Sequence, residues 1–127
     1  RVAYPLGEGP AAVLEPRVVK DVPVPSGIKR PPPIILNGVT FHFRMVQGWV
    51  KKDVKNVYYR DYTCDTIIIV NLRRRYRDVS VIAGGVRLLK YRMSSGRVTS
   101  VRAPEGGFPK TLDIDVAVVK KTVDETP

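Results

Sequence analysis

The densest group of side chains that could do chemistry in this sequence consists of Arg73, Arg74, Arg75 and Arg77. The planar guanidinium of arginine donates parallel hydrogen bonds, a geometry that matches the oxygens of a phosphate group. In a chain with a net charge of +10, three adjacent arginines cannot all find acidic partners. The cluster therefore predicts contacts with the phosphate backbone of RNA.

Two further basic groups extend this prediction. The remaining candidate RNA-binding residues are Arg87, Lys90, Arg92, Lys51, Lys52 and Lys55. Contacts of this kind give affinity and a steep dependence on salt, but they do not read a base sequence. A solvated protein face is the alternative interpretation of the same charges. Trp49 and Tyr62 could stack on exposed RNA bases, and packing in the protein is the alternative for both.

Catalysis and metal binding find little support in the sequence. His42 is the only histidine and Cys64 the only cysteine, so neither a dyad nor a multi-cysteine metal site is expected. Asp113 and Asp115 share a strand face and could hold a cation, but a solvated face explains them as well. No glycine pair is followed by the Lys-Ser/Thr of a phosphate-binding loop. The sequence therefore predicts a protein that is not an enzyme, with no cofactor, no metal site and no small-molecule substrate.

Proline and charge divide the chain into three zones. Residues 1–38 hold 8 of the 11 prolines, and Pro31, Pro32 and Pro33 favour an extended conformation. Residues 39–102 hold 14 basic and four acidic residues, and residues 103–127 hold three basic and five acidic ones. We expect an extended arm over 1–38, with a disordered tail as the alternative, and one basic RNA-binding domain over 39–127.

The elements that must position the charges follow from hydrophobic periodicity. Strands are expected over 39–45, 57–62, 66–72, 97–102 and 110–116, with basic loop residues over 48–56. Val79, Ile82, Val86 and Leu89 have helical spacing, which predicts a helix within 73–92, although Gly84-Gly85 is unfavourable there. A turn is expected at 94–96, a hairpin loop at 103–109, and a strand turn or short helix over 118–125. The predicted fold class is α+β, with a small mixed or antiparallel sheet of about five strands backed by one or two helices.

Several short motifs occur in an order that resembles a known family. They are Pro23-Val24-Pro25-Ser26-Gly27, Pro31-Pro32-Pro33, Phe41-His42-Phe43-Arg44, Tyr58-Tyr59-Arg60-Asp61-Tyr62-Thr63, Ile67–Leu72, Arg97-Val98-Thr99-Ser100-Val101 and Thr111-Leu112-Asp113-Ile114. This order resembles the mitochondrial large-subunit ribosomal protein family numbered forty-nine in its series. The resemblance spans roughly residues 23–124.

The resemblance implies a fold like that of the initiation factor that selects start codons, a mixed sheet backed by two helices. It also implies a structural role in the large subunit of the mitochondrial ribosome, in the mitochondrial matrix. The partners would be ribosomal RNA and neighbouring ribosomal proteins, the latter contacted by the N-terminal arm and the acidic C-terminal segment.

Two other function classes fit the composition. A free RNA-binding translation factor would share the basic charge, and a viral coat or nucleocapsid subunit would share both the charge and the β-rich pattern. Insertion into a membrane is not expected, because no apolar run approaches the roughly 20 residues that span a bilayer.

Overall fold

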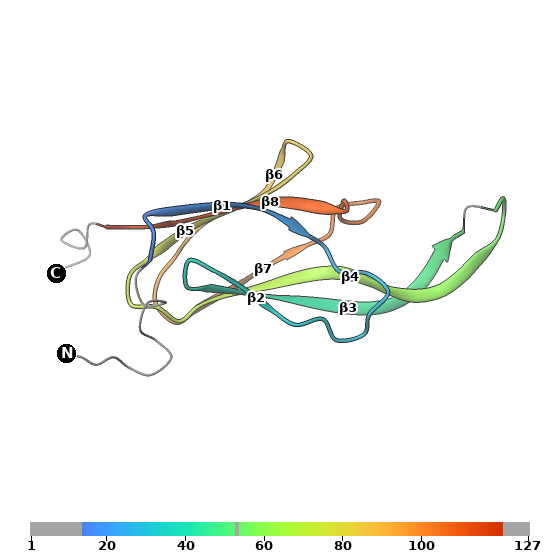
Figure 1. The fold of residues 1–127 in the computed structure, drawn as a ribbon, viewed down its shortest axis with the longest axis horizontal. Coiled ribbons are helices and arrows are strands. Elements are labelled where there is room, and N and C mark those ends of the chain that lie inside the picture. The colour runs from blue at the N-terminus through green and yellow to red at the C-terminus, as the bar shows by residue number, and fades with distance from the viewer. Residues whose placement is uncertain (1–13, 53, 121–127) are drawn as a thin grey trace.

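The computed structural model describes residues 14–52 and 54–120, which form eight β-strands. The strands are β1 (Arg17–Pro23), β2 (Ile34–Leu36), β3 (Val39–Lys51), β4 (Tyr58–Asn71), β5 (Arg77–Ala83), β6 (Val86–Met93), β7 (Arg97–Arg102) and β8 (Thr111–Val118). They build two four-stranded antiparallel sheets. Sheet 1 has the order β1-β8-β5-β6, and sheet 2 has the order β2-β3-β4-β7. Figure 1 shows the two sheets as two layers, with β3 and β4 extending well beyond them.

The core lies between the sheets, and every strand contributes to it. Strand β3 shows why: Val39, Phe41 and Phe43 are buried, while His42 and Arg44, which point to the opposite face, are exposed. Alternation with a period of two buries one face of a strand and leaves the other in water. On β4, Ile67 and Ile69 fill the same layer, and Val79, Val81, Ile114 and Val116 face them from sheet 1.

The predicted α+β fold class is wrong, because the described residues form strands and no helix. Residues 73–76 of this stretch belong to the β4–β5 connection, and residues 77–92 lie in the β5–β6 hairpin, whose two-residue turn is Gly84-Gly85. Both glycines have positive φ, 56° and 83°, as this type of tight hairpin turn requires. The apolar residues with helical spacing therefore belong to two paired strands. Nor do the described residues form the two helices that the family resemblance implies.

The strand predictions agree with the structure better than the helix prediction does. Residues 97–102 form β7 as expected, the strand predicted at 39–45 lies within β3, and the strand predicted at 110–116 coincides with β8 from Thr111 onward. The predictions at 57–62 and 66–72 were too short, because one long strand, β4, runs through both. The loop predicted over 48–56 was too long, since β3 continues to Lys51. The loop at 103–109 connects β7 in sheet 2 to β8 in sheet 1, so it is not a hairpin loop.

Part of the proline-rich zone belongs to the sandwich. Strand β1 pairs with β8 and buries Val22, and strand β2 pairs with β3 and buries Leu36. Residues 1–13 of the expected arm and 121–127 of the C-terminal segment lie outside the described residues. Within the described part of the chain, no helix is long and apolar enough to cross a membrane.

A buried polar network holds together the end of the sandwich where β4 stops. Nδ2 of Asn71 donates to the carbonyl oxygens of Met93 (2.9 Å), Ser94 (3.3 Å) and Arg75 (3.3 Å), and its Oδ1 accepts from the backbone N–H of Arg73 (3.0 Å). One side chain thus ties the β4–β5 connection to the β6–β7 turn. Amide and carbonyl groups are costly to bury without hydrogen-bond partners. The network therefore fixes the position of the β4–β5 connection relative to the β6–β7 turn.

The β2–β3 turn closes against the same end of the sandwich. Asn37 and Gly38 both have positive φ, and a Cβ atom at Gly38 would lie 2.7 Å from Cγ of Arg73. We therefore expect Gly38→Ala to lower the free energy of unfolding by about 1–2 kcal/mol in urea denaturation. Gly48→Ala is the matched control, because nothing lies within 4 Å of a Cβ there and its φ is not positive. Equal effects of the two substitutions would contradict the conclusion that the positive φ of Gly38 and its close approach to Arg73 require glycine at this position.

Candidate nucleic-acid interface

The β3–β4 hairpin projects from the sandwich as a two-stranded ribbon. We use the name distal ribbon for residues 45–51 of β3 and 58–64 of β4, together with the connection at 52–57. Strand β2 reaches only Phe41 on β3, and β7 reaches only Thr66 on β4. Beyond these points the two strands pair with each other. The rest of the described chain hydrogen-bonds to β4 there through an isolated bridge between Ser26 and Thr63 and through the backbone N–H of Ala103, which donates to the carbonyl of Asp65. Figure 1 shows the ribbon curving away from the two layers.

A β-bulge marks the base of the distal ribbon. The register between β3 and β4 shifts between Arg44 and Met45, which leaves Asp65 as the extra residue on β4. Arg44 pairs with the Asp65 carboxylate through two hydrogen bonds, of 3.0 and 2.8 Å. These hydrogen bonds hold the pKa of the Asp65 carboxyl below its usual range. Because a bulge bends and twists its strand, it accounts for the change of direction at this point.

The register sorts the ribbon residues onto two sides. On one side lie three directly opposed pairs: Gln47 with Tyr62, Trp49 with Arg60, and Lys51 with Tyr58. We call this the inner side, because alternation along β3 places it on the same side as the core residues Phe41 and Phe43. Sheet 1 covers that side in the sandwich, but not in the ribbon (Figure 1).

Large aromatic and basic side chains alternate on the inner side and are mostly exposed. Trp49 is 70% exposed and Tyr58 is 55% exposed. Lys51 and Arg60 are also exposed, whereas Tyr62 is half-buried near the base. The Arg60 guanidinium lies 5.7 Å from the centre of the Trp49 ring, a cation–π arrangement. Gln47 accepts a 3.5 Å hydrogen bond from Arg60.

The opposite, outer side of the ribbon has a different composition. It carries Val46, Gly48 and Val50 on β3, and Tyr59 and Asp61 on β4. Lys52, at the tip, places its ammonium 5.5 Å from the centre of the Tyr59 ring. The Asp61 carboxylate accepts a hydrogen bond from the backbone N–H of Tyr62. Only the inner side therefore combines several exposed rings with cations and lacks a carboxylate.

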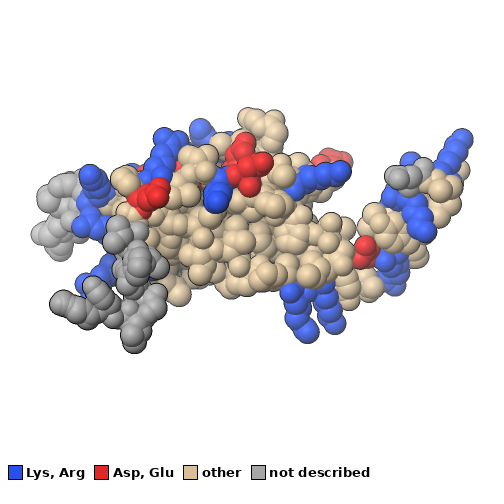
Figure 2. All heavy atoms as spheres, in the orientation of Figure 1, with Lys and Arg blue, Asp and Glu red and all other residues tan. Residues whose placement is uncertain are grey.

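The structure places the predicted RNA-binding residues in three separate regions. Lys51, Lys52 and Lys55 lie at the ribbon tip and are exposed, and Figure 2 shows basic side chains gathered there. The arginine cluster lies at the far end of β4, with Arg73, Arg74 and Arg75 in the β4–β5 connection and Arg77 at the start of β5. The residues Arg87, Lys90 and Arg92 lie on β6, at the edge of sheet 1.

The arginine cluster divides into exposed and buried members. Arg74 and Arg75 are exposed, and Arg75 donates a 2.7 Å hydrogen bond to the carbonyl of Lys120. Arg77 is only 1% exposed, and it donates to the carbonyl oxygens of Asn37 and Arg75, each at 2.8 Å. Burial lowers the pKa of the Arg77 guanidinium, and the nearby charges of Arg73 and Arg75 lower it further. Arg77 is thus part of the sandwich interior and has no surface to offer a ligand.

The β6 residues share their surroundings with carboxylates. Arg92 forms a two-pronged pair with Asp78 across the β5–β6 hairpin, at 2.7 and 2.9 Å. Arg87 and Lys90 are exposed along a shallow depression that Asp78 and Asp115 also line. A phosphate approaching this surface would meet both signs of charge. The charged residues described at the ribbon tip, Lys51, Lys52 and Lys55, are all basic, so the tip is a more favourable place for a polyanion.

Sequence reasoning did not single out Tyr58 and Arg60 as site residues. The signal that could have found them is the alternation Gln47-x-Trp49-x-Lys51 and Tyr58-x-Arg60-x-Tyr62, which puts six polar or aromatic side chains on one face of a hairpin. Trp49 was recognised, and its exposure excludes the alternative that it is packed in the core. Tyr62 is half-buried, which is compatible both with stacking on a base and with packing in the protein.

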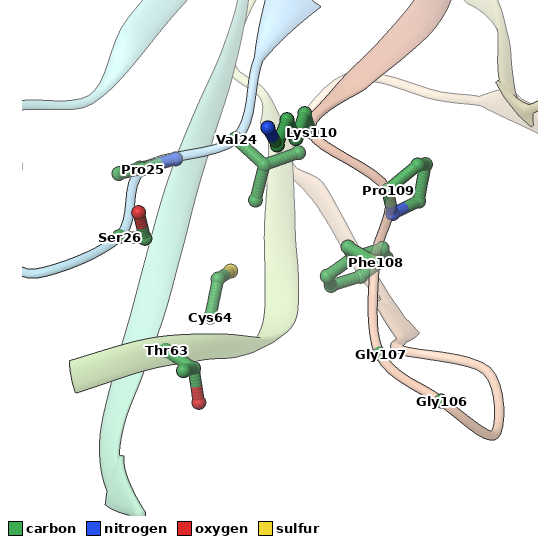
Figure 3. Close-up of a pocket in the computed structure, with 10 residues that line it drawn as sticks. All are labelled: Val24, Pro25, Ser26, Thr63, Cys64, Gly106, Gly107, Phe108, Pro109 and Lys110. Carbon is green, nitrogen blue, oxygen red and sulfur yellow. The ribbon is translucent and has the colours of Figure 1, made fainter. Parts of the chain in front are cut away.

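A cavity of about 400 Å³ opens where the ribbon joins the sandwich (Figure 3). The side chains of Val24, Cys64 and Phe108 point into it, from the β1–β2 connection, β4 and the β7–β8 loop. Cys64 is a free, buried thiol that donates a 3.4 Å hydrogen bond to the carbonyl of Thr66, and burial raises the pKa of this thiol. A thiol held in its neutral form is a poor nucleophile, so the cavity offers no activated group.

The other residues considered for chemistry lie apart from one another. His42 is exposed on β3. Asp115 accepts hydrogen bonds from Arg17, while Asp113 is exposed on β8. No group of three or more histidine, cysteine, aspartate or glutamate residues that could hold a metal ion occurs among residues 14–52 and 54–120.

The geometry of the distal ribbon thus describes a basic, aromatic surface on a projecting hairpin. Comparison with known proteins adds no family to this description: no protein-family model, no curated protein and no solved structure matches the chain.

Proposed function

We propose that this protein is a non-catalytic RNA-binding protein that holds RNA with its distal ribbon. The observation that carries the proposal is the exposure of Trp49 and Tyr58 beside Lys51 and Arg60 on one side of a hairpin that projects from the sandwich. A projecting ribbon can enter or follow a nucleic-acid surface that the flat sandwich faces cannot reach. The rings supply base contacts and the cations supply phosphate contacts, which are the two components of RNA recognition.

Electrostatics support the same surface. The tip and its strands contribute four basic side chains, Lys51, Lys52, Lys55 and Arg60. The total charge of +10 attracts polyanions from a distance, and the tip concentrates part of it on a narrow projection. Arg74 and Arg75, at the opposite end, are available for a second, weaker phosphate contact.

The test is a binding titration with RNA at two salt concentrations. If the four ribbon cations each neutralise a phosphate, counterion release predicts that raising the salt from about 50 to 200 mM weakens binding by about 50-fold. Fluorescence anisotropy of a labelled oligonucleotide measures this directly. A protein that ignores RNA at the lower salt concentration, or whose affinity does not respond to salt, would overturn the proposal.

Membership of the mitochondrial large ribosomal subunit is a narrower prediction, and it rests on the sequence resemblance alone. A high-salt wash of ribosomes followed by sedimentation tests it, because a structural component stays with the large subunit through the wash. A free translation factor would dissociate. A viral coat or nucleocapsid subunit would instead form particles without ribosomal components.

A further inference from the structure

We infer that the inner side of the distal ribbon recognises single-stranded RNA, by stacking unpaired bases on Trp49 and Tyr58. This inference rests on the proposed function and names the form of RNA that the same surface takes. It is carried by the exposure of the rings, by their spacing, and by the difference between the two sides of the ribbon.

The first step concerns exposed aromatic surface. Folding gains free energy by burying large rings, so a tryptophan that is 70% exposed on a strand is unfavourable for the isolated protein. The neighbouring Tyr58, 55% exposed, adds to the same side. A flat ring supported by a strand is a ready platform for a flat base. Stacking of this kind tolerates any base sequence, because every base has a π-face.

The second step concerns spacing. Trp49 is directly opposite Arg60, and Lys51 is directly opposite Tyr58, so each ring has a cation beside it across the ribbon. Diagonal neighbours on one face of an antiparallel pair lie about 7–8 Å apart. Two bases of an extended strand can therefore rest on the two rings while Lys51 and Arg60 reach the phosphates between and beside them. Gln47 supplies a hydrogen-bonding group further along the same side.

The third step separates single strands from duplexes. The bases of a duplex already stack on one another and present only their edges in the grooves. Edges are read by amide and guanidinium groups, whereas the main feature of the inner side is ring surface. The outer side presents one ring, that of Tyr59, beside Val46 and Val50. It also carries the Asp61 carboxylate, which repels phosphate. An unpaired strand on the inner side is thus the best match.

The experiment uses the full chain and three probes: a 12-nucleotide oligouridine, a blunt RNA duplex of the same length, and vesicles containing phosphatidylserine. Trp49 is the only tryptophan of the chain, so its fluorescence reports directly on this surface. We expect the single strand to quench this fluorescence and to bind at least about 10-fold more tightly than the duplex at equal salt. Trp49→Leu should weaken binding of the single strand by about 10-fold, and Tyr58→Leu should have a similar effect.

Tyr59→Leu is the matched control, because it removes a ring from the outer side of the same ribbon; it should change affinity less than twofold. Tighter binding of the duplex, or an unchanged affinity of the Trp49→Leu variant for the single strand, would overturn the inference and leave RNA binding itself standing. Failure of both RNAs to bind would overturn the proposed function as well. Binding to vesicles without binding to RNA would assign the ribbon to an anionic membrane surface and overturn both.

Discussion

Replacing Lys51, Lys52 and Lys55 together by glutamine is expected to weaken RNA binding by about 100-fold at 0.1 M salt. Each cation that contacts a single strand contributes about 0.7 to the slope of log affinity against log salt, so three lost contacts lower that slope by about 2. All three side chains are exposed at the ribbon tip, and glutamine keeps much of their length. Anisotropy titrations over a range of salt concentrations measure the affinity and the slope together.

The matched control is the triple replacement of Lys20, Arg87 and Lys90 by glutamine on sheet 1. It lowers the net charge from +10 to +7, as the ribbon variant does, so the long-range attraction for RNA is the same in both. Because these three residues lie on β1 and β6, away from the ribbon, we expect a loss of less than about 5-fold. Equal losses in the two variants would show that only total charge matters, which contradicts a site at the ribbon.

Most strands of this fold were predictable, but the β5–β6 hairpin was wrongly predicted as a helix, for a reason that lies in particular residues. Val39, Phe41 and Phe43, and likewise Leu112, Ile114 and Val116, alternate strictly and are buried as alternation requires. In the 73–92 stretch, the spacing of Val79, Ile82, Val86 and Leu89 fits a helix as well as a hairpin. The deciding feature is Gly84-Gly85, because two consecutive residues with positive φ suit a tight hairpin turn and not a helix.

A similar signal lies at Asn37-Gly38, where the Asn-Gly pair between two apolar runs marks the β2–β3 turn. The pairing of strands that are distant in the sequence was not predictable in this way. Strand β1 pairs with β8 almost a hundred residues later, and nothing local in residues 17–23 specifies that partner. Long-range pairing depends on how the faces of all strands are buried together, which a single sequence does not display.

The candidate site was predictable in its charges and not in its geometry. Lys51, Lys52 and Lys55 are a visible cluster, and Trp49 is a visible aromatic beside them. Arg77 looked equivalent to its neighbours Arg74 and Arg75, yet alternation within β5 turns it inward beside Val79 and Val81. The importance of Tyr58 and Arg60 depends on the register of β3 against β4. That register includes a bulge at Asp65, which no feature of the sequence predicts.

The largest expected effect on stability comes from Asn71→Ala, which should lower the free energy of unfolding by about 3 kcal/mol. Asn71 is fully buried at the end of β4, and its side chain donates to the carbonyls of Arg75, Met93 and Ser94 and accepts from the N–H of Arg73. Alanine leaves these groups without that partner in the interior, where each costs about 1–3 kcal/mol if water does not replace it. Urea denaturation followed by circular dichroism measures the change.

Asn71→Asp distinguishes lost hydrogen bonds from lost volume, because aspartate has nearly the same shape. Its carboxylate can still accept from Arg73, but it cannot donate to the three carbonyls and would face them with like partial charge. The Asp variant should therefore be at least as unstable as the Ala variant at neutral pH. Lowering the pH protonates the carboxyl, restores one donor and should recover part of the stability. Ser100→Ala, at an exposed position of β7, should change stability by less than about 0.5 kcal/mol. An Asp variant as stable as the original protein would show that the donors of Asn71 do not hold this end of the sandwich together.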